Sequence, residues 1–250
     1  MMANDPHGSW TDGGDFRTKR APEVSVIIPC LNEALNAALY EETLFTPLAA
    51  APFDSEVIFS DGGSSDGTPE IIERLSARKT EVRVLRSENN TCFAESIARA
   101  LAVSKGEYIV LFEADLSFAP GDISKLLAAA KAGNYDCVCG SPFLGSFEGL
   151  GFTREALTRF ANLLLRLRFD GSVTSYTQIF KLFRADSLRT LDFESKGFSL
   201  DAELLAKCLS RGFRINEVPV IMKGRELGDS KLNVVPEILN CLGLILKGVR

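Results

Sequence analysis

The sequence predicts an α/β domain in which helices flank a mostly parallel central sheet. Apolar, β-branched runs alternate with helical segments through the first half of the chain, as they do in right-handed βαβ units. Three of these runs end in polar clusters, and ligands of parallel sheets bind at the carboxyl ends of the strands. The chain has 250 residues, of which 46% are hydrophobic, so one domain can bury a core of its own.

The first half contains four expected strands, at 24–29, 56–61, 82–87 and 107–115. Helices are expected between them, at 33–50, 69–79 and 93–104. Thr68 is the expected N-cap of the second helix, with Pro69 at its first position.

The second half predicts helices at 121–132, 154–168, 200–210 and 234–249, and strands at 136–141, 177–184 and 214–222. Glycine-rich residues 143–151 and charged residues 223–231 are expected to form loops, the first of them mobile. We therefore divide the chain into a flexible N-terminal tail (1–22), a single α/β domain (23–233) and a C-terminal amphipathic helix (234–250).

Composition excludes several kinds of protein. The formal net charge of −5 argues against general nucleic-acid binding. His7 is the single histidine and lies in a polar segment, which excludes a Ser-His-Asp site and a histidine-rich metal site. A metal here would need oxygen ligands, which favours Mg²⁺ or Mn²⁺. The six cysteines include no Cys-x-x-Cys pair, as expected for buried, reduced thiols in a cytoplasmic protein.

Glu113 and Asp115 flank Ala114 where the fourth expected strand ends. Side chains alternate along a strand, so we expect both carboxylates on one face. Two such carboxylates repel each other unless a cation lies between them. A Mg²⁺ or Mn²⁺ ion held there could bind a diphosphate. The alternative is a pair of solvated carboxylates.

Asp61 closes the second expected strand and precedes Gly62 and Gly63. Its carboxylate could accept hydrogen bonds from a base or ribose, and the glycines would allow close approach of a ligand. The alternative is a glycine-rich turn in which Asp61 only shapes the backbone. We expect Asp66 to shape the turn before the next helix.

Together these segments resemble the family 2 inverting glycosyltransferases, which have the GT-A fold, and in particular the dolichyl- or polyprenyl-phosphate mannose or glucose synthase branch. The resemblance covers about residues 22–233. It rests on five segments in order: VSVIIPCLNE, EVIFSDGGSSDGT, EADLSFAPGDI, GFSLDAELLAKCLSRGFRINEVPV and GRELGDSKL.

The resemblance implies a nucleoside-diphosphate sugar, GDP- or UDP-linked, as donor, and a polyprenyl phosphate as acceptor. It implies that the nucleotide sugar contacts Pro29, Leu31, Glu33, Phe59, Asp61, Ala114 and Asp115. Glu113, Asp115 and Ser117 would hold the metal. Asp115, Arg225 and Lys231 would act in catalysis, the two basic residues through the diphosphate or acceptor phosphate. Arg154 and Arg159 match basic positions that could bind the acceptor phosphate. Ordinary solvated charges are the alternative for all four basic residues.

Three positions depart from the family pattern. Glu113 stands where an aspartate is usual. Pro142 replaces an arginine that the family uses for the acceptor phosphate, and Ser175 replaces an acid in the motif that ends at Lys181. The last two changes favour an alternative, a glycosyltransferase with a hydroxyl acceptor. That reaction needs a carboxylate base, for which Asp201 and Glu203 are candidates.

Two further alternatives are a sugar-nucleotide-binding protein without catalysis and a nucleotidyltransferase, the latter disfavoured because no basic phosphate loop follows the first strand. No signal peptide or membrane span is apparent, so we expect a cytoplasmic protein. Helix 234–249, with its apolar face and basic end, could lie on a membrane or pack against the domain. The sequence leaves the oligomeric state open, a homo-oligomer included.

Overall fold

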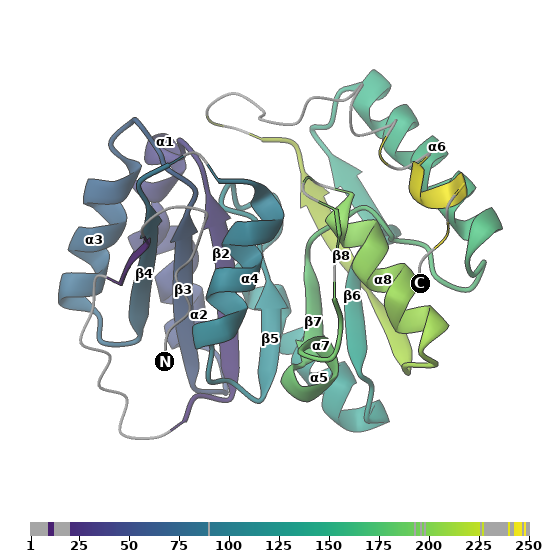
Figure 1. Ribbon diagram of the computed structural model, residues 1–250, viewed down its shortest axis with the longest axis horizontal. Coiled ribbons are helices and arrows are strands. Elements are labelled where there is room, and N and C mark those ends of the chain that lie inside the picture. The colour runs from purple at the N-terminus through teal and green to yellow at the C-terminus, as the bar shows by residue number, and fades with distance from the viewer. Residues whose placement is uncertain are drawn as a thin grey trace.

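A computed structural model describes residues 10–12, 21–89, 91–192, 194–195, 197, 199–225, 227, 240, 243–246 and 248. Its strands form one sheet in the order β1-β4-β3-β2-β5-β7-β6-β8, and helices cover both faces (Figure 1). The predicted fold class is confirmed. In the described part of the chain, no helix is long and apolar enough to cross a membrane.

The N-terminal half of the sheet is the parallel part. Strands β2 (Val24–Cys30), β3 (Ser55–Asp61), β4 (Val82–Ser87) and β5 (Tyr108–Leu111) pair in parallel, in the order β4-β3-β2-β5. Nearly every residue of β2 and β3 is buried, because helices cover both faces of the strands. All four strands therefore direct their carboxyl ends to one edge.

The C-terminal half adds strands of both directions. β7 (Lys181–Arg184) runs antiparallel to both β5 and β6 (Cys137–Glu148). β8 (Ile215–Lys223) then pairs in parallel with β6. Since Lys181 pairs with Leu111, the segment that leads into β7 lies at the edge where β5 ends.

Two apolar cores lie on opposite faces of the sheet, as the alternation of side chains along a strand requires. Val26 and Ile28 of β2 join the first core and Ile27 joins the second. The first core lies under α1 (Ala34–Ala37), the π-helix η1 (Glu41–Phe45), α2 (Thr46–Ala49), α3 (Thr68–Arg78) and α5 (Ile123–Gly133), which follows the 3₁₀ turn η2 (Pro120–Asp122). The second lies under α4 (Phe93–Val103), α6 (Phe152–Arg168), α7 (Ala185–Leu188) and α8 (Leu200–Ser210).

Several expected boundaries differ from the structure. Residues 143–148, predicted as a mobile loop, extend β6. Gly145 allows β8 to approach closely here, because a side chain at this position would collide with the backbone of Val220. The strand expected at 107–115 ends at Leu111. The strand expected at 177–184 begins only at Lys181, and the helix expected at 33–50 is divided into three short segments.

Two differences concern the chain ends. Trp10–Asp12, inside the tail that we expected to be flexible, forms β1, which pairs antiparallel with β4. Most of the predicted C-terminal helix lies outside the described residues, although 240 and 243–246 are helical.

Candidate active site

The end of β3 forms a buried polar turn around Asp61. Asp61 is completely buried, and its carboxylate accepts hydrogen bonds from the Ser64 backbone N–H at 3.2 Å and from the Ser64 hydroxyl. Burial raises the pKa of Asp61, while the bonds from Ser64 partly oppose that rise. Gly63 has a φ of 98°, which favours glycine. The carboxylate is thus held in one orientation at the strand end.

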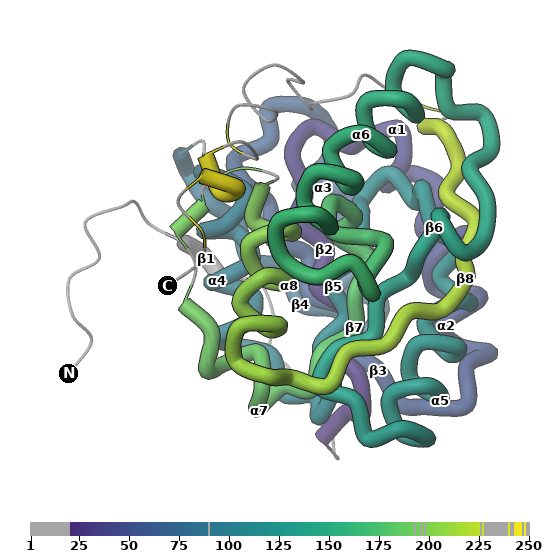
Figure 2. The backbone as a smooth tube through the Cα atoms, turned by 90° about the vertical axis from the view of Figure 1, so that its right-hand side faces the viewer, coloured from purple at the N-terminus to yellow at the C-terminus, as the bar shows by residue number. Residues whose placement is uncertain are grey.

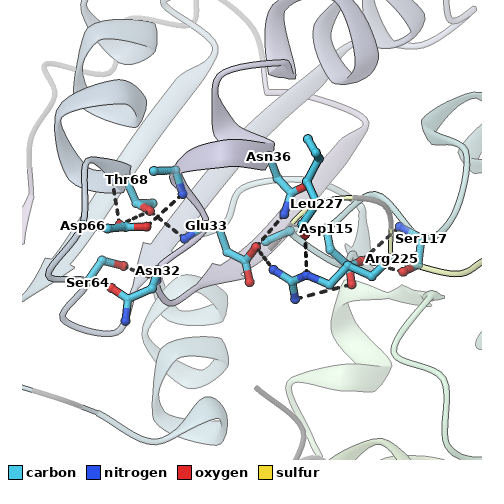
Figure 3. Close-up of polar contacts among 12 residues, drawn as sticks. Asn32, Glu33, Asn36, Ser64, Asp66, Thr68, Asp115, Ser117, Arg225 and Leu227 are labelled. Carbon is cyan, nitrogen blue, oxygen red and sulfur yellow. Dashed lines mark hydrogen bonds and ion pairs between the residues drawn. The ribbon is translucent and has the colours of Figure 1, made fainter. Parts of the chain in front are cut away.

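Asp66 ties the β3 turn to the end of β2 (Figure 3). Its carboxylate accepts the backbone N–H of Thr68 at 2.9 Å and that of Ala34 at 3.1 Å. The Thr68 hydroxyl accepts the N–H of Glu33 at 2.7 Å. Burial tends to raise the pKa of Asp66, but the bonds from Thr68 outweigh it and the pKa is lowered. The prediction that Asp66 shapes this turn is confirmed; Thr68, expected as the N-cap, is the first residue of α3.

Glu33 and Asp115 meet at Arg225, as Figure 3 shows. The guanidinium forms an ion pair with Oε2 of Glu33, and its Nη1 lies 3.7 Å from Oδ2 of Asp115. Asn36 donates to the same Glu33 oxygen at 2.7 Å, and Nε of Arg225 donates to the Leu227 carbonyl at 2.8 Å. Burial tends to lower the pKa of Arg225, but the carboxylates of Glu33 and Asp115 outweigh that effect and raise the pKa above its ordinary value. Residues nearly 200 positions apart thus share one charged contact.

Asp115 lies in the turn beyond β5, where Leu116 has a φ of 55°. Its Oδ1 accepts two bonds from Ser117, from the backbone N–H at 3.0 Å and from the hydroxyl at 2.7 Å. Glu113 is also past the strand, so the strand alternation we expected does not set its direction. Burial and the charges of Asp115 and Asp201 raise the pKa of Glu113, while Arg154 lowers it. The acidic side chains therefore lie close enough to repel one another.

This set of oxygen donors fits a magnesium or manganese ion. The repulsion between Glu113 and Asp115 is the kind that a bound cation relieves. Among the residues that the structure describes, no three acidic, cysteine or histidine side chains form a complete metal cage. Magnesium commonly uses one or two carboxylates and takes its other ligands from water and substrate phosphates, so a complete cage is unnecessary.

Of the other residues predicted to contact the nucleotide, some lie at the surface and others in the core. Pro29 and Leu31 are partly exposed at the end of β2. Phe59 is completely buried and stacks on Tyr40, with ring centroids 5.4 Å apart. The Tyr40 hydroxyl donates to the Ala114 carbonyl at 2.7 Å, which ties the η1 segment to the acidic turn. Phe59 therefore supports the site from below and offers no surface for a base.

The two arginines predicted to bind the acceptor phosphate, Arg154 and Arg159, lie in different surroundings. Arg154 is close enough to Glu113 to lower its pKa. Arg159 forms an ion pair with Glu155 at 2.8 Å, and its guanidinium carbon lies 4.9 Å from the Phe147 ring centroid. Arg154 therefore belongs near the acidic site, whereas Arg159 packs on the outer end of β6. Lys231 lies outside the described residues.

The two candidate bases also differ. Glu203 is buried and accepts the backbone N–H groups of Glu194 and Ser195 at 2.8 and 2.7 Å; its carboxylate also pairs with Lys207 at 3.0 Å. Those contacts give it a structural role. Asp201 is buried too, and its charge raises the pKa of Glu113. Of the two, Asp201 is the residue beside the site.

Glu217 of β8 is a residue that the sequence analysis missed. Its Oε2 accepts the backbone N–H and the hydroxyl of Thr174 at 2.8 and 2.9 Å, and its Oε1 accepts the N–H of Ser175 at 2.9 Å. The Ser175 hydroxyl donates to Gln178 at 3.0 Å. A carboxylate from β8 thus contacts the backbone at the position where the family pattern has an acid. No clear signal marked it in the sequence, because Glu217 lies on the face of β8 that also carries exposed Pro219 and Lys223.

Two buried side chains hold the rest of this segment. Asn162 of α6 accepts the N–H of Tyr176 at 2.7 Å and donates to the Thr177 hydroxyl at 2.8 Å. Lys181, almost completely buried, donates from Nζ to the Tyr176 carbonyl at 3.2 Å and to the Gln178 carbonyl. The segment before β7 is therefore fixed by side chains from several elements.

The fold and the site define a class: an α/β protein with a buried carboxylate, an acidic pair and an arginine gathered at the carboxyl edge of its parallel strands. Residues 25–192 match the description "Glycosyl transferase family 2". The chain belongs to this family.

Two relatives extend the comparison. The chain is 30% identical over 237 residues to glycosyltransferase AglD of Haloferax volcanii, an alignment that covers 92% of this chain and 37% of AglD. It is 29% identical over 218 residues to undecaprenyl-phosphate mannosyltransferase of Micrococcus luteus, with 84% of this chain and 87% of that protein covered. The chain thus spans little more than a third of the first relative and most of the second.

Solved structures agree on the fold. Glucosyl-3-phosphoglycerate synthase of Mycobacterium tuberculosis, solved with Mn²⁺, uridine diphosphate and phosphoglyceric acid, has a TM-score of 0.66 and 20% identity to this chain. The match covers 92% of this chain and 80% of that one. The same protein has been solved with Mg²⁺ and uridine diphosphate.

Proposed function

We propose that this glycosyltransferase moves a hexose from a nucleoside-diphosphate sugar to a polyprenyl phosphate, with inversion at the anomeric carbon. The observation that carries the proposal is the meeting of Glu33, Asp115 and Arg225 at the edge where Asp61 also lies. Carboxylates that hydrogen-bond hydroxyls and an arginine that binds phosphate are what a nucleoside diphosphate requires. The Micrococcus relative, which spans nearly the same length, is named for an undecaprenyl-phosphate acceptor.

In this proposal each described residue has one task. Asp61, which is completely buried, holds the Ser64 turn in place under the base or ribose, and Pro29, Leu31, Glu33 and Ala114 border the nucleotide. Asp115 and Glu113 hold a Mg²⁺ or Mn²⁺ ion, and Ser117 orients Asp115 through its two hydrogen bonds. Such an ion, when bound, neutralises the charge of a diphosphate.

For transfer, a phosphate oxygen of the acceptor attacks the anomeric carbon as the bond from that carbon to the diphosphate breaks. The nucleoside diphosphate leaves with the electron pair. Arg225 stabilises its growing charge, and we assign the same task to Lys231 from the family motif. Arg154 lies near Glu113 and would meet the acceptor phosphate there. Because that phosphate is already anionic, no general base is required.

The test is direct transfer to undecaprenyl phosphate in detergent. GDP-mannose, UDP-glucose and UDP-N-acetylglucosamine, each radiolabelled, are offered with Mn²⁺ or Mg²⁺, with and without EDTA. We expect one donor to give a labelled lipid that mild acid hydrolyses, and EDTA to abolish its formation. Labelled lipid formed equally well in EDTA would contradict the metal role, and no labelled lipid from any donor would contradict the lipid acceptor.

A hydroxyl acceptor is the second candidate, and Asp201 is the observation that favours it. Asp201 is buried and its charge raises the pKa of Glu113, so its carboxylate is a candidate to take a proton from an attacking hydroxyl. Pro142 and Ser175 point the same way, because they replace family residues on the acceptor side. The substitution Asp201→Asn separates the two reactions: it should abolish transfer to a hydroxyl and leave transfer to a phosphate largely intact.

A further inference from the structure

Tyr40 is a buried tyrosine whose hydroxyl reaches the acidic turn. The side chain is completely buried, and its hydroxyl donates to the Ala114 carbonyl at 2.7 Å. Ala114 lies between Glu113 and Asp115, the two acids assigned to the metal in the proposed function. The contact joins residues 74 positions apart. A buried hydroxyl that ends on the backbone between two metal ligands can influence the metal without touching it.

In the described part of the chain, the turn that carries these acids has little backbone support of its own. The sheet pairing of β5 ends at Leu111, and the Phe112 N–H still donates to the Ile27 carbonyl at 2.9 Å. Beyond Phe112, the turn closes through a long bond of 3.3 Å from the Leu116 N–H to the Glu113 carbonyl. Leu116 has a φ of 55°, which a side chain disfavours. Contacts from outside the turn therefore help to hold its shape.

The ring of Tyr40 is itself fixed by its neighbours. It stacks on Phe59 of β3, with ring centroids 5.4 Å apart and an interplanar angle of 9°. Tyr40 directly precedes the π-helix η1, and π-helices are rare and frequently occur at functional sites. In both Figure 1 and Figure 2, α1 lies toward the top of the molecule and α2 lower, so the chain that joins them runs down the face of the sheet. The Tyr40 hydroxyl is thereby held in one place against the turn.

Ala114 is anchored at a second point. Its side chain is buried in the first core, whereas Glu113 and Asp115 on either side of it are partly exposed. With the side chain and the carbonyl of Ala114 both held, the backbone between the two acids has one position. The carboxylates can then turn only about their own side-chain bonds.

We propose that Tyr40 is a positioning residue for the divalent cation: its hydrogen bond to Ala114 sets the backbone from which Glu113 and Asp115 reach the ion. This inference rests on the metal role in the proposed function. Removal of a group that orients metal ligands commonly lowers metal affinity by about 10- to 100-fold. Mg²⁺ demands near-octahedral geometry, whereas Ca²⁺ accepts its oxygen ligands in a flexible arrangement. The tether should therefore matter more for Mg²⁺ than for Ca²⁺.

Calorimetry of the full chain tests the proposal. UDP and GDP are titrated in saturating Mg²⁺ and again in saturating Ca²⁺, and the nucleotide that binds more tightly is used for the comparison. Tyr40→Phe keeps the ring and its stack on Phe59 but removes the hydroxyl. We expect its affinity for that nucleotide to fall by about tenfold with Mg²⁺ and by less than about threefold with Ca²⁺.

Tyr176→Phe is the matched control. Tyr176 is also completely buried, and its hydroxyl exchanges hydrogen bonds with the backbone N–H and carbonyl of Asp170, each at 3.0 Å. These bonds lie in the segment that follows α6 and not in the acidic turn. Thermal melting checks that both variants fold, and Tyr176→Phe should keep the parental nucleotide affinity with both cations.

Unchanged affinity of Tyr40→Phe with Mg²⁺ would overturn the proposal, and so would an equal loss with both cations or an equal loss in Tyr176→Phe. In each of these cases the parent still binds the nucleotide with Mg²⁺, so the proposed function stands. A parent chain that binds neither nucleotide more tightly with Mg²⁺ than in EDTA would defeat the metal role and this inference together.

Discussion

Arg225 joins carboxylates that come from two different strand ends. Its guanidinium contacts Glu33 beyond β2 and lies 3.7 Å from an oxygen of Asp115 beyond β5. A diphosphate that enters the site would offer this arginine a more highly charged partner than either carboxylate. The same side chain can therefore link the two carboxylates before the donor binds and contact the diphosphate of the donor afterwards.

We expect Arg225→Gln to lower kcat/KM for the sugar nucleotide by about 100-fold, the usual range for losing one donor to a developing negative charge. Steady-state kinetics with the donor found above measure it. Arg211→Gln, an exposed arginine whose guanidinium contacts the backbone at Thr190, is the control and should keep parental kinetics. An unchanged kcat/KM for Arg225→Gln would remove the arginine from the mechanism.

Asp115 gives a second prediction at this scale. Asp115→Asn keeps the size of the side chain but removes a negative charge, so binding of Mn²⁺ with nucleoside diphosphate should weaken by at least about tenfold and transfer should be lost. Calorimetry with Mn²⁺ and the nucleoside diphosphate gives the affinity. Asp186→Asn, on the exposed surface of α7, should bind as the parent does. Parental Mn²⁺ affinity in Asp115→Asn would place the metal elsewhere.

At the scale of elements, β8 and the segment before β7 depend on one another. Glu217 accepts three hydrogen bonds from Thr174 and Ser175, two of them from backbone N–H groups. Sequence alternation along β8 puts Glu217 on the face opposite Val218, Val220 and Met222, which predicts a solvated side chain. Its partners lie about forty residues earlier and are apparent only when β6, β7 and β8 are assembled.

Glu217→Ala should lower the free energy of unfolding by about 2–3 kcal/mol, because it leaves partly buried N–H groups without their charged acceptor. Urea denaturation followed by circular dichroism measures this. Glu148→Ala, an exposed glutamate on β6, should change stability by less than about 0.5 kcal/mol. Equal stabilities of the two variants would show that the Glu217 contacts contribute nothing measurable.

At the scale of the whole molecule, buried acids couple folding to pH. Burial tends to raise the pKa of Glu203, but hydrogen bonds from Ser195 and Glu194 and the contact with Lys207 outweigh it and leave the pKa lowered. A carboxyl group whose pKa is lowered by folding stabilises the fold above its ordinary pKa of about 4.3. That contribution is lost as the pH falls through the lower pKa of the folded state.

Glu203→Gln should therefore be less stable than the parent at pH 7, and the difference should shrink as the pH approaches 3. Urea titrations at pH 7, 5 and 3.5 give the comparison, with the exposed residue Glu88 changed to Gln as control. A difference that stayed constant over this range would mean that ionisation of Glu203 does not contribute to folding stability.

The sequence alone determined the fold class, most of the elements and the residues at the strand ends. Those features are local, because the pattern of apolar residues within one segment identifies a strand or a helix. The strand at 82–87 and the helix at 200–210 were predicted with the same bounds that the structure has. The family motifs added the roles expected of Asp61, Asp115 and Arg225.

Only the tertiary structure decided which of these residues meet, because contacts between distant segments depend on strand order and register. It brought Arg225 to Glu33 and Asp115, placed Asp201 rather than Glu203 beside the acidic pair, and supplied Glu217 to the backbone at Ser175. It also left four large apolar side chains of α6 exposed to solvent: Phe152, Phe160, Leu163 and Leu167. Periodicity shows that α6 has an apolar arc, but whether that arc faces the core or the solvent is set by the elements packed around the helix.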